Sequence, residues 1–227
     1  VLELPTVWAV SSAETFARGA VGILAAAGVV DVLSFGSECG AADRLRQVAA
    51  CLNSPVYESG VRRFVDEGMP FAAARQEVVR GILGPERSAL LSTPNNNLGV
   101  EYLRALDRMG SAIRPVTVRR EGAPHDSLLV GETPPEFLSA TQLRAFLEAE
   151  DWRAAEPYLP GGGAEVLRRS WGGMPGLRRV ERGLLARLRT MTAGDWAALP
   201  DSGAAEGLPP RLERAGKQCR SLEEFFQ

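Results

Sequence analysis

Hydrophobic and polar positions repeat at two different periods in the first part of the chain. Residues 1–5 alternate apolar and polar side chains before a proline, and residues 29–35 form a largely apolar run that ends at a glycine turn. Both patterns predict strands. Between them, Ser11 and Glu14 have the spacing of a helix-capping box, and apolar residues recur at helical intervals up to Gly28. Strand, helix and strand in this order predict a βαβ unit of a parallel sheet, which binds ligands at the carboxyl ends of its strands.

The pattern then becomes helical before one more strand. Residues 41–84 have helical periodicity broken by two prolines, and we assign no chemistry to them. Residues 94–97, a proline and three asparagines, predict a polar loop. The loop leads into residues 98–106, where an apolar side chain at every fourth position predicts an amphipathic helix. Residues 113–120 predict the next strand, with Arg120 at its end.

A second helix start carries a different set of polar groups. Ser139 stands three residues before Gln142, which is the capping-box spacing, and apolar residues follow at helical intervals. Free backbone N–H groups, the helix dipole, the hydroxyls of Ser139 and Thr141 and the guanidinium of Arg144 can converge there on one phosphate. A capping serine is more often only a cap, so the pattern by itself leaves both interpretations open.

Charge and composition suggest two parts. The 227 residues can bury one core with an appendage, and the net charge of −2 gives no overall attraction to nucleic acid. Strand patterns end after Asp151, so we expect a nucleotide-binding domain over residues 1–150 and a helical, arginine-rich region over residues 151–227. From Gly161 onward, eleven Lys or Arg stand against eight Asp or Glu. The helix near Leu177 places Leu177 and Val180 inward and arginines outward, and this arginine face is either an RNA contact or a solvated surface.

Cysteine and histidine usage excludes some classes of protein. Three cysteines without C-x-x-C spacing and a single histidine, His125, make a structural zinc site or a disulfide framework unlikely. No apolar run approaches the ~20 residues that span a bilayer, and no signal peptide is evident. We therefore expect a cytoplasmic protein with no membrane partner.

Taken together, the residues point to a nucleotide pocket at the strand ends. Arginines would hold phosphates, and amides would hydrogen-bond a base or ribose. The candidate residues are Gly36, Asn95, Arg120, Ser139, Thr141 and Arg144.

Several stretches resemble a known family. Leu-Ser-Ala-Thr-Gln-Leu-Arg, from Leu138 to Arg144, is similar to the phosphate-binding signature of the nucleotidyltransferase superfamily that also carries a His-x-Gly-His motif. The order of the other stretches resembles the bacterial tRNA(Met) cytidine acetate ligase family over essentially all 227 residues. These stretches are Val-Leu-Glu-Leu-Pro, Ser-Phe-Gly-Ser-Glu, Pro-Asn-Asn-Asn-Leu-Gly-Val-Glu-Tyr-Leu, Pro-His-Asp and Glu206-Gly-Leu208.

The resemblance implies both a fold and a reaction. The fold would be α/β: a Rossmann-like nucleotidyltransferase parallel sheet, followed by an all-helical extension. The enzyme would be an ATP-dependent ligase that joins ATP and acetate into acetyl-adenylate and acetylates N4 of the wobble cytidine of elongator tRNA(Met). Mg²⁺ would accompany the polyphosphate, with no metal held by protein side chains.

The resemblance also implies roles for the candidate residues. Gly36 would let the backbone approach ATP, Asn95 would hydrogen-bond the nucleotide, and Arg120 would hold its phosphates. The Ser139 helix start, with its threonine and arginine, would complete the phosphate cradle.

Departures from the family pattern leave other functions open. The first strand and the His-x-Gly-His loop have no counterpart in the sequence, so we expect an internal portion of a longer enzyme and assign no catalytic residue. Pro124 replaces the usual tyrosine before His125-Asp126, whose role is open. The alternatives are nucleotidyl transfer to a small phosphorylated metabolite and a non-catalytic nucleotide- or RNA-binding module. The sequence does not determine the oligomeric state.

Overall fold

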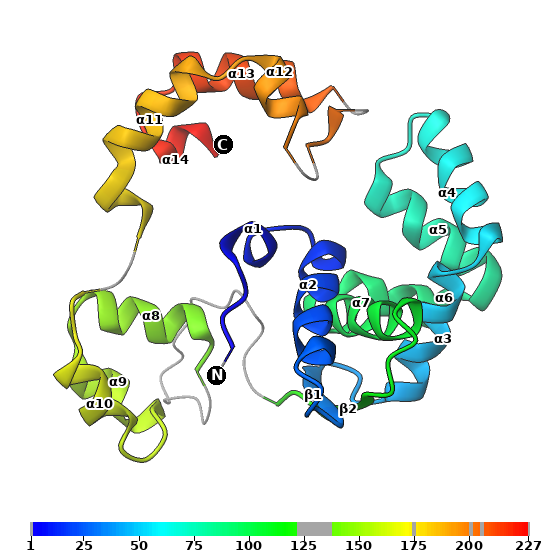
Figure 1. The fold of residues 1–227 in the computed structure, drawn as a ribbon, viewed down its shortest axis with the longest axis horizontal. Helices are drawn as coiled ribbons and strands as arrows, with labels where there is room; N and C mark the ends of the chain where they lie inside the picture. Colours follow the sequence, from blue (N-terminus) through cyan, green and yellow to red (C-terminus); the bar gives the residue numbers. More distant parts are fainter. Residues whose placement is uncertain (1, 122–137, 174–175, 200–201, 205–206, 227) are drawn as a thin grey trace. The chain divides into compact units, whose positions relative to one another are not determined.

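The computed structural model describes residues 2–226 except 122–137, 174–175, 200–201 and 205–206 (Figure 1). The chain forms two compact units, Val1–Glu121 and Gly122–Gln227, and each is described by itself. The sequence predicted a nucleotide-binding domain over residues 1–150 and a helical region over residues 151–227. That assignment of roles stays a prediction.

The first unit combines two strands with a set of helices. Its strands are β1 (Val32–Ser37) and β2 (Arg114–Arg119). Its helices are α1 (Thr6–Ala9), α2 (Ala13–Ala26), α3 (Ala42–Leu52), α4 (Pro55–Asp66), α5 (Phe71–Leu83), α6 (Pro85–Ser88), the short 3-10 helix η1 (Ala89–Ser92) and α7 (Pro94–Arg108). The two proline breaks predicted between residues 41 and 84 separate α3, α4 and α5, as expected.

The two strands pair in parallel, which is the type of sheet that the sequence predicted, but β1 pairs with β2 and not with residues 1–5. Gly36 lies opposite Val118, and Ser37 lies opposite Arg119. The face with Leu33 and Phe35 packs against the hydrophobic core of this unit. The other face carries Gly36 and Val118, which are exposed. Because side chains alternate across a strand, the same register that buries Phe35 leaves Gly36 open.

Helix α7 is the central element of the first unit. It contacts α2 on one side and α3 on the other, and it also contacts β1 (Figure 1). Its buried residues include Val100 and Leu103, which join residues of α3 and α5 in one core. Gly99 allows the close approach of the sheet, because a Cβ there would lie 2.7 Å from the Phe35 ring.

The structure corrects three details of the sequence prediction in this unit. Residues 2–5 form no strand, since no strand in the described part of the chain pairs with them. The N-cap of α2 is Ser12, whose hydroxyl accepts the Thr15 N–H, whereas Ser11 donates to the carbonyl of Val7. Residues 94–97 are the first turn of α7 and not a loop.

The described residues of the second unit form helices joined by turns and loops, with no strand among them. Its α-helices are α8 (Ala140–Glu148), α9 (Trp152–Ala155), α10 (Gly163–Arg169), α11 (Glu181–Thr190), α12 (Ala193–Ala197), α13 (Leu208–Gln218) and α14 (Leu222–Phe225). Its 3-10 helices include η2 (Glu156–Tyr158) and η3 (Leu177–Val180).

Leu185, Cys219 and Leu222 form a small core among α11, α13 and α14. The predicted inward position of Leu177 and Val180 is wrong, because both are more than half exposed. They belong to η3, and the change from 3-10 to α geometry shifts the phase of the apolar stripe. Among the described residues, no helix is long and apolar enough to cross a membrane.

Candidate functional site

The site is built on the turn that follows β1. Ser37, which is fully buried, shares a hydrogen bond of 2.7 Å with the Thr117 hydroxyl, and its oxygen also accepts the Gly40 N–H at 3.0 Å. Gly40 has a φ of +60° and lies against β2, where an added Cβ would come within 2.6 Å of the Arg119 Cβ. Both the backbone conformation and the lack of space therefore require glycine here. The turn is held against the end of β2.

Glu38 connects this turn to the start of α7. Its Oε1 accepts the Asn95 side-chain N–H at 2.6 Å and the Asn95 backbone N–H at 3.1 Å, and its Oε2 accepts the Asn96 backbone N–H at 2.6 Å. The carboxylate thus satisfies N–H groups that the first turn of a helix leaves free, and it lies at the positive end of the helix dipole. The N-terminal residue of α7, Pro94, lacks an N–H and needs no such partner.

These contacts keep Glu38 ionised. Burial raises the pKa of its carboxyl, but the hydrogen bonds from the Asn95 side chain and from the Asn95 and Asn96 backbone outweigh burial. The pKa consequently lies below its ordinary value. Sequence reasoning assigned no role to Glu38, although the Gly-Ser-Glu turn after a strand placed it at the correct edge of the sheet.

Gly36 and Arg120 are brought together on the open face of the sheet. The Arg120 backbone N–H donates to the Ser37 carbonyl at 2.9 Å, which continues the strand pairing by one residue. A Cβ added to Gly36 would lie 3.1 Å from the Arg120 Cγ. The absence of a side chain at Gly36 leaves room for the stem of Arg120 beside the strand. Three predicted residues therefore meet at one edge: Gly36, Arg120 and, through Glu38, Asn95.

The predicted phosphate cradle lies in the second unit. Ser139 and Gln142 form the predicted capping box at the start of α8: the Gln142 N–H donates to the Ser139 hydroxyl at 3.2 Å, and the Ser139 N–H donates to the Gln142 Oε1 at 2.9 Å. Thr141 is half-buried, and Arg144 is exposed. The Gln142 Nε2 is buried and has no partner among the described residues. The role of these residues in binding phosphate stays a prediction.

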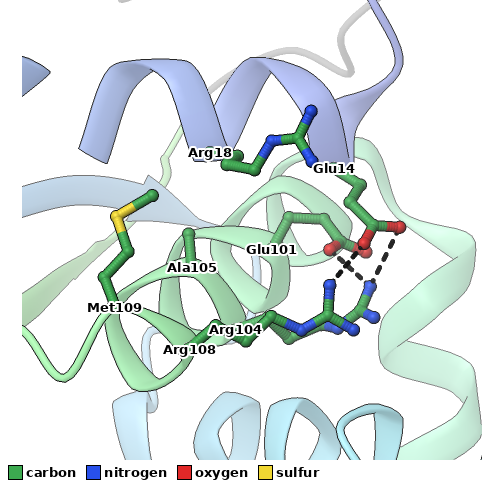
Figure 2. Close-up of a pocket in the computed structure, with 7 residues that line it drawn as sticks. All are labelled: Glu14, Arg18, Glu101, Arg104, Ala105, Arg108 and Met109. Atoms are coloured by element: carbon green, nitrogen blue, oxygen red, sulfur yellow. Dashed lines mark hydrogen bonds and ion pairs between the residues drawn. The ribbon is translucent and has the colours of Figure 1, made fainter. Parts of the chain in front are cut away.

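A buried charge cluster lies further along α7 (Figure 2). Glu101, whose side chain is 1% exposed, is paired with Arg75 and with Arg104, the latter at 2.7 Å. Glu14 of α2 pairs with Arg104 at 3.4 Å and with Arg108 at 2.7 Å. This cluster joins α2, α5 and α7, and sequence reasoning did not detect it.

A cavity of about 230 Å³ lies beside this cluster, and Arg18 and Met109 are part of its lining. Its residues on α7 begin at Glu101, and Arg104 lies nine residues beyond Asn95, which is about 14 Å along a helix axis. The arginines nearest Glu14 are already paired (Figure 2). The cavity is therefore separate from the turn at β1.

Two other features complete the description of the site. The segment with His125 and Asp126 lies outside the described residues. Within the described ranges, no group of three or more His, Cys, Asp or Glu side chains could hold a metal ion.

A parallel strand edge, a glycine beside an arginine and a capped helix start are features expected of a nucleotide-binding protein. The sequence profile described as HIGH Nucleotidyl Transferase matches residues 1–227, and the chain belongs to this family.

Individual relatives within this family share one name. The chain is similar to proteins named tRNA(Met) cytidine acetate ligase from Alkaliphilus metalliredigens, at 36% identity, and from Thermoanaerobacter sp., at 37% identity. In both cases the match covers 100% of this chain and 56% of the relative. The chain thus spans about half the length of the curated relatives it matches.

Solved structures confirm the predicted fold class. The crystal structure of Thermotoga maritima TmcAL in its apo form has a TM-score of 0.85 and 30% identity, over 99% of this chain and 54% of that chain. A second structure of the same protein, bound with alpha-thio ATP, has a TM-score of 0.83 and 31% identity, over 99% and 53%. The chain has the α/β nucleotidyltransferase fold with a small parallel sheet.

Proposed function

We propose that this chain is the nucleotide-binding part of an ATP-dependent acetate ligase. The enzyme joins acetate and ATP into acetyl-adenylate and acetylates N4 of the wobble cytidine of elongator tRNA(Met). The observation that carries this proposal is the likeness to TmcAL bound with alpha-thio ATP over 99% of this chain. The names of the relatives, tRNA(Met) cytidine acetate ligase, supply the acceptor and the acid.

The geometry at the end of β1 supports the nucleotide site. Gly36 has no side chain, and the space that a side chain would take is filled by the stem of Arg120, so this glycine lets the arginine lie on the open face of the sheet. Arg120 is exposed beside it and makes no ion pair with any described residue, so its guanidinium is available for phosphate. Asn95 offers an amide at the same edge. The resemblance to the family further supports phosphate contacts by Ser139, Thr141 and Arg144.

In this proposal the protein acts by positioning and by charge neutralisation. An oxygen of acetate attacks the α-phosphorus of ATP, the bond to the bridging oxygen of pyrophosphate breaks, and pyrophosphate leaves. The cytidine N4 then attacks the acetyl carbon, AMP departs with the carboxyl oxygen, and N4 loses a proton. Arg120 and Arg144 offset the negative charge of the phosphates, while Asn95 hydrogen-bonds the nucleoside.

Mg²⁺ fits this scheme as a partner of the polyphosphate. The described residues offer no cluster of carboxylates for it. Mg²⁺ is commonly held by substrate phosphates and water, and there it would neutralise part of their charge.

The tRNA would contact the arginines of η3 and α11. Residues 177–190 contain five arginines and one glutamate. Arg182 and Arg189 are exposed and make no ion pair with any described residue. They lie seven positions apart, close to two helical turns, so they share one face at a separation of about 10 Å. Such a pair can contact successive parts of an RNA backbone.

The test of the proposal is transfer of radiolabelled acetate to tRNA(Met) by the full-length product of the gene. We expect incorporation that requires ATP and releases AMP. Nucleotide turnover with a phosphorylated metabolite, without need of tRNA, would instead support the alternative transferase. Nucleotide binding without any turnover would support the binding module.

Two variant series locate the contacts. Arg120→Ala and Arg144→Ala should each weaken ATP binding by roughly 1.5–3 kcal/mol, the loss of a charge-assisted contact. The control Arg62→Ala, an exposed arginine of α4, should leave ATP binding unchanged. The double variant Arg182→Glu and Arg189→Glu should weaken tRNA binding and lower its salt dependence, with ATP binding unaffected.

A further inference from the structure

The amide of Asn95 is held in one orientation by Glu38. An ionised carboxylate only accepts hydrogen bonds, so the Asn95 amide must turn its NH2 group toward Glu38. It does so at 2.6 Å, and the carboxylate is itself fixed by the backbone N–H groups of Asn95 and Asn96. Rotation of the amide by half a turn would place its carbonyl oxygen against the carboxylate. The orientation therefore follows from chemistry and not from packing alone.

The carbonyl oxygen of Asn95 is consequently the group left for a ligand. Asn95 Oδ1 makes no hydrogen bond to any described residue, and it is not enclosed. The neighbouring amide differs, because Asn96 Oδ1 accepts the Cys39 N–H at 3.0 Å and its Nδ2 donates to the Thr93 hydroxyl at 2.6 Å. Asn96 is 3% exposed and fully engaged. Only the first of these two amides can recognise a nucleotide.

The same carboxylate excludes phosphate from the start of α7. A helix N-terminus ordinarily attracts anions, but here Glu38 occupies its N–H groups and adds a negative charge. A phosphate at this place would meet like charge and find no free donor among these groups. The exposed Arg120 is then the better place for the polyphosphate, which leaves the first turn of α7 for the nucleoside.

We propose that Glu38 is a positioning residue that turns the Asn95 carbonyl oxygen to the nucleotide, so that the site selects a nucleoside with a hydrogen-bond donor at this point. The donor is either the exocyclic amine of adenine or a ribose hydroxyl. This inference rests on the proposed function, since it takes Asn95 to contact the nucleotide of that site.

Nucleotide selectivity tests the proposal. The affinities of ATP, ITP, 2′-deoxyATP and 3′-deoxyATP are measured by calorimetry for the full-length wild-type protein, Glu38→Gln and Asn95→Ala. ITP has an oxo group in place of the adenine amine, and each deoxynucleotide lacks one hydroxyl. If the adenine amine is the donor, the wild-type protein should bind ATP about tenfold or more tightly than ITP. If a hydroxyl is the donor, it should bind ATP more tightly than one deoxynucleotide by the same affinity ratio.

Substitution of Glu38 should abolish that selectivity. In Glu38→Gln the new NH2 group can donate to the Asn95 carbonyl, the amide is free to turn, and the affinity ratio should fall to near one. A ratio that keeps its wild-type value in this variant overturns the proposal, as does a wild-type protein that binds all four nucleotides equally. A purely structural role of Glu38 would weaken all four alike and leave the ratio intact.

Asn95→Ala keeps the proposal testable if the Glu38 variant does not fold. This variant leaves the backbone cap of α7 in place, removes the selecting oxygen, and should likewise bring the ratio to near one. If ATP affinity itself does not change in Asn95→Ala, the assignment of Asn95 to the nucleotide site fails. If ATP affinity falls but the ratio stays at its wild-type value, that assignment holds and the orienting role of Glu38 is overturned.

Discussion

Replacement of Glu101 by glutamine should strongly destabilise the first unit. Glu101 is 1% exposed and accepts hydrogen bonds from two arginines, Arg75 and Arg104, whose side chains are 14% and 7% exposed. Arg104 has weaker neighbours in Glu14 at 3.4 Å and in the carbonyl of Leu52 at 3.5 Å. Glutamine keeps the volume of the side chain but removes its charge. It also turns an NH2 group toward one of the two guanidinium groups.

The loss of stability in Glu101→Gln can be estimated from the contacts that the two arginines keep and lose. Two charge-assisted hydrogen bonds, each worth about 1.5–3 kcal/mol, lose the charge of their acceptor. Arg104 keeps Glu14, but Arg75 is left without a carboxylate, and breaking a largely buried pair in this way typically costs about 3–5 kcal/mol. We therefore expect Glu101→Gln to lower the free energy of unfolding of the first unit by about 3–5 kcal/mol. That is a large part of the ~5–15 kcal/mol that a domain usually has.

Hydrogen exchange of the α7 amides, followed by mass spectrometry, reports the free energy of opening in this unit alone. Arg80→Ala is a suitable control, because the Arg80–Glu77 pair has side chains 59% and 37% exposed. Loss of such a surface pair should change stability by no more than ~1 kcal/mol. A change below ~1 kcal/mol for Glu101→Gln would refute the claim that this buried cluster holds α5 and α7 together.

Three further predictions concern local structure. Gly40→Ala should lower the melting temperature more than Gly28→Ala. Both glycines have a positive φ, but only at Gly40 would a Cβ meet Arg119, so equal losses would contradict this reasoning. The contribution of Glu38 to the free energy of unfolding should be complete above its ordinary pKa of about 4.5 and lost as the pH falls through its lower folded pKa. In Glu38→Gln the free energy of unfolding should therefore fall less steeply with decreasing pH in this acid range. Ser139→Ala should raise hydrogen exchange in α8 by the equivalent of about 1 kcal/mol, and unchanged exchange would show that the cap is dispensable.

Local signals predicted much of the secondary structure correctly. The capping box at Ser139 is present as predicted, because the residues that form it are three positions apart. The prolines also marked the helix boundaries correctly, because a proline breaks a helix locally: Pro55 is the first residue of α4, and Pro70 is the N-cap of α5. The parallel type of the sheet was predicted correctly, but the predicted βαβ unit was wrong, because residues 2–5 form no strand and β1 pairs with β2 instead.

Long-range contacts explain what the sequence did not reveal. The asparagine run was predicted as a loop because its cap, Glu38, lies 57 positions from Asn95 in sequence. Glu101 sits between Val100 and Leu103 on a buried face, where its pairs with Arg104, three positions further along α7, and with Arg75 of α5 make a charge tolerable. The pair with Arg104 is local, but nothing in the local pattern indicates the distant partners Arg75 and, for Glu38, Asn95. The nucleotide roles of Gly36 and Arg120 stay predictions, although the structure brings the two residues together.

The most direct test of the central claim is exchange of labelled pyrophosphate into ATP by the full-length product of the gene, without tRNA. The proposed function predicts exchange that requires acetate, because only acetyl-adenylate formation makes pyrophosphate release reversible in this way. Arg120→Ala should reduce this exchange, and the exposed control Arg62→Ala should not. A folded protein that binds ATP but shows no exchange with acetate would contradict the proposed function.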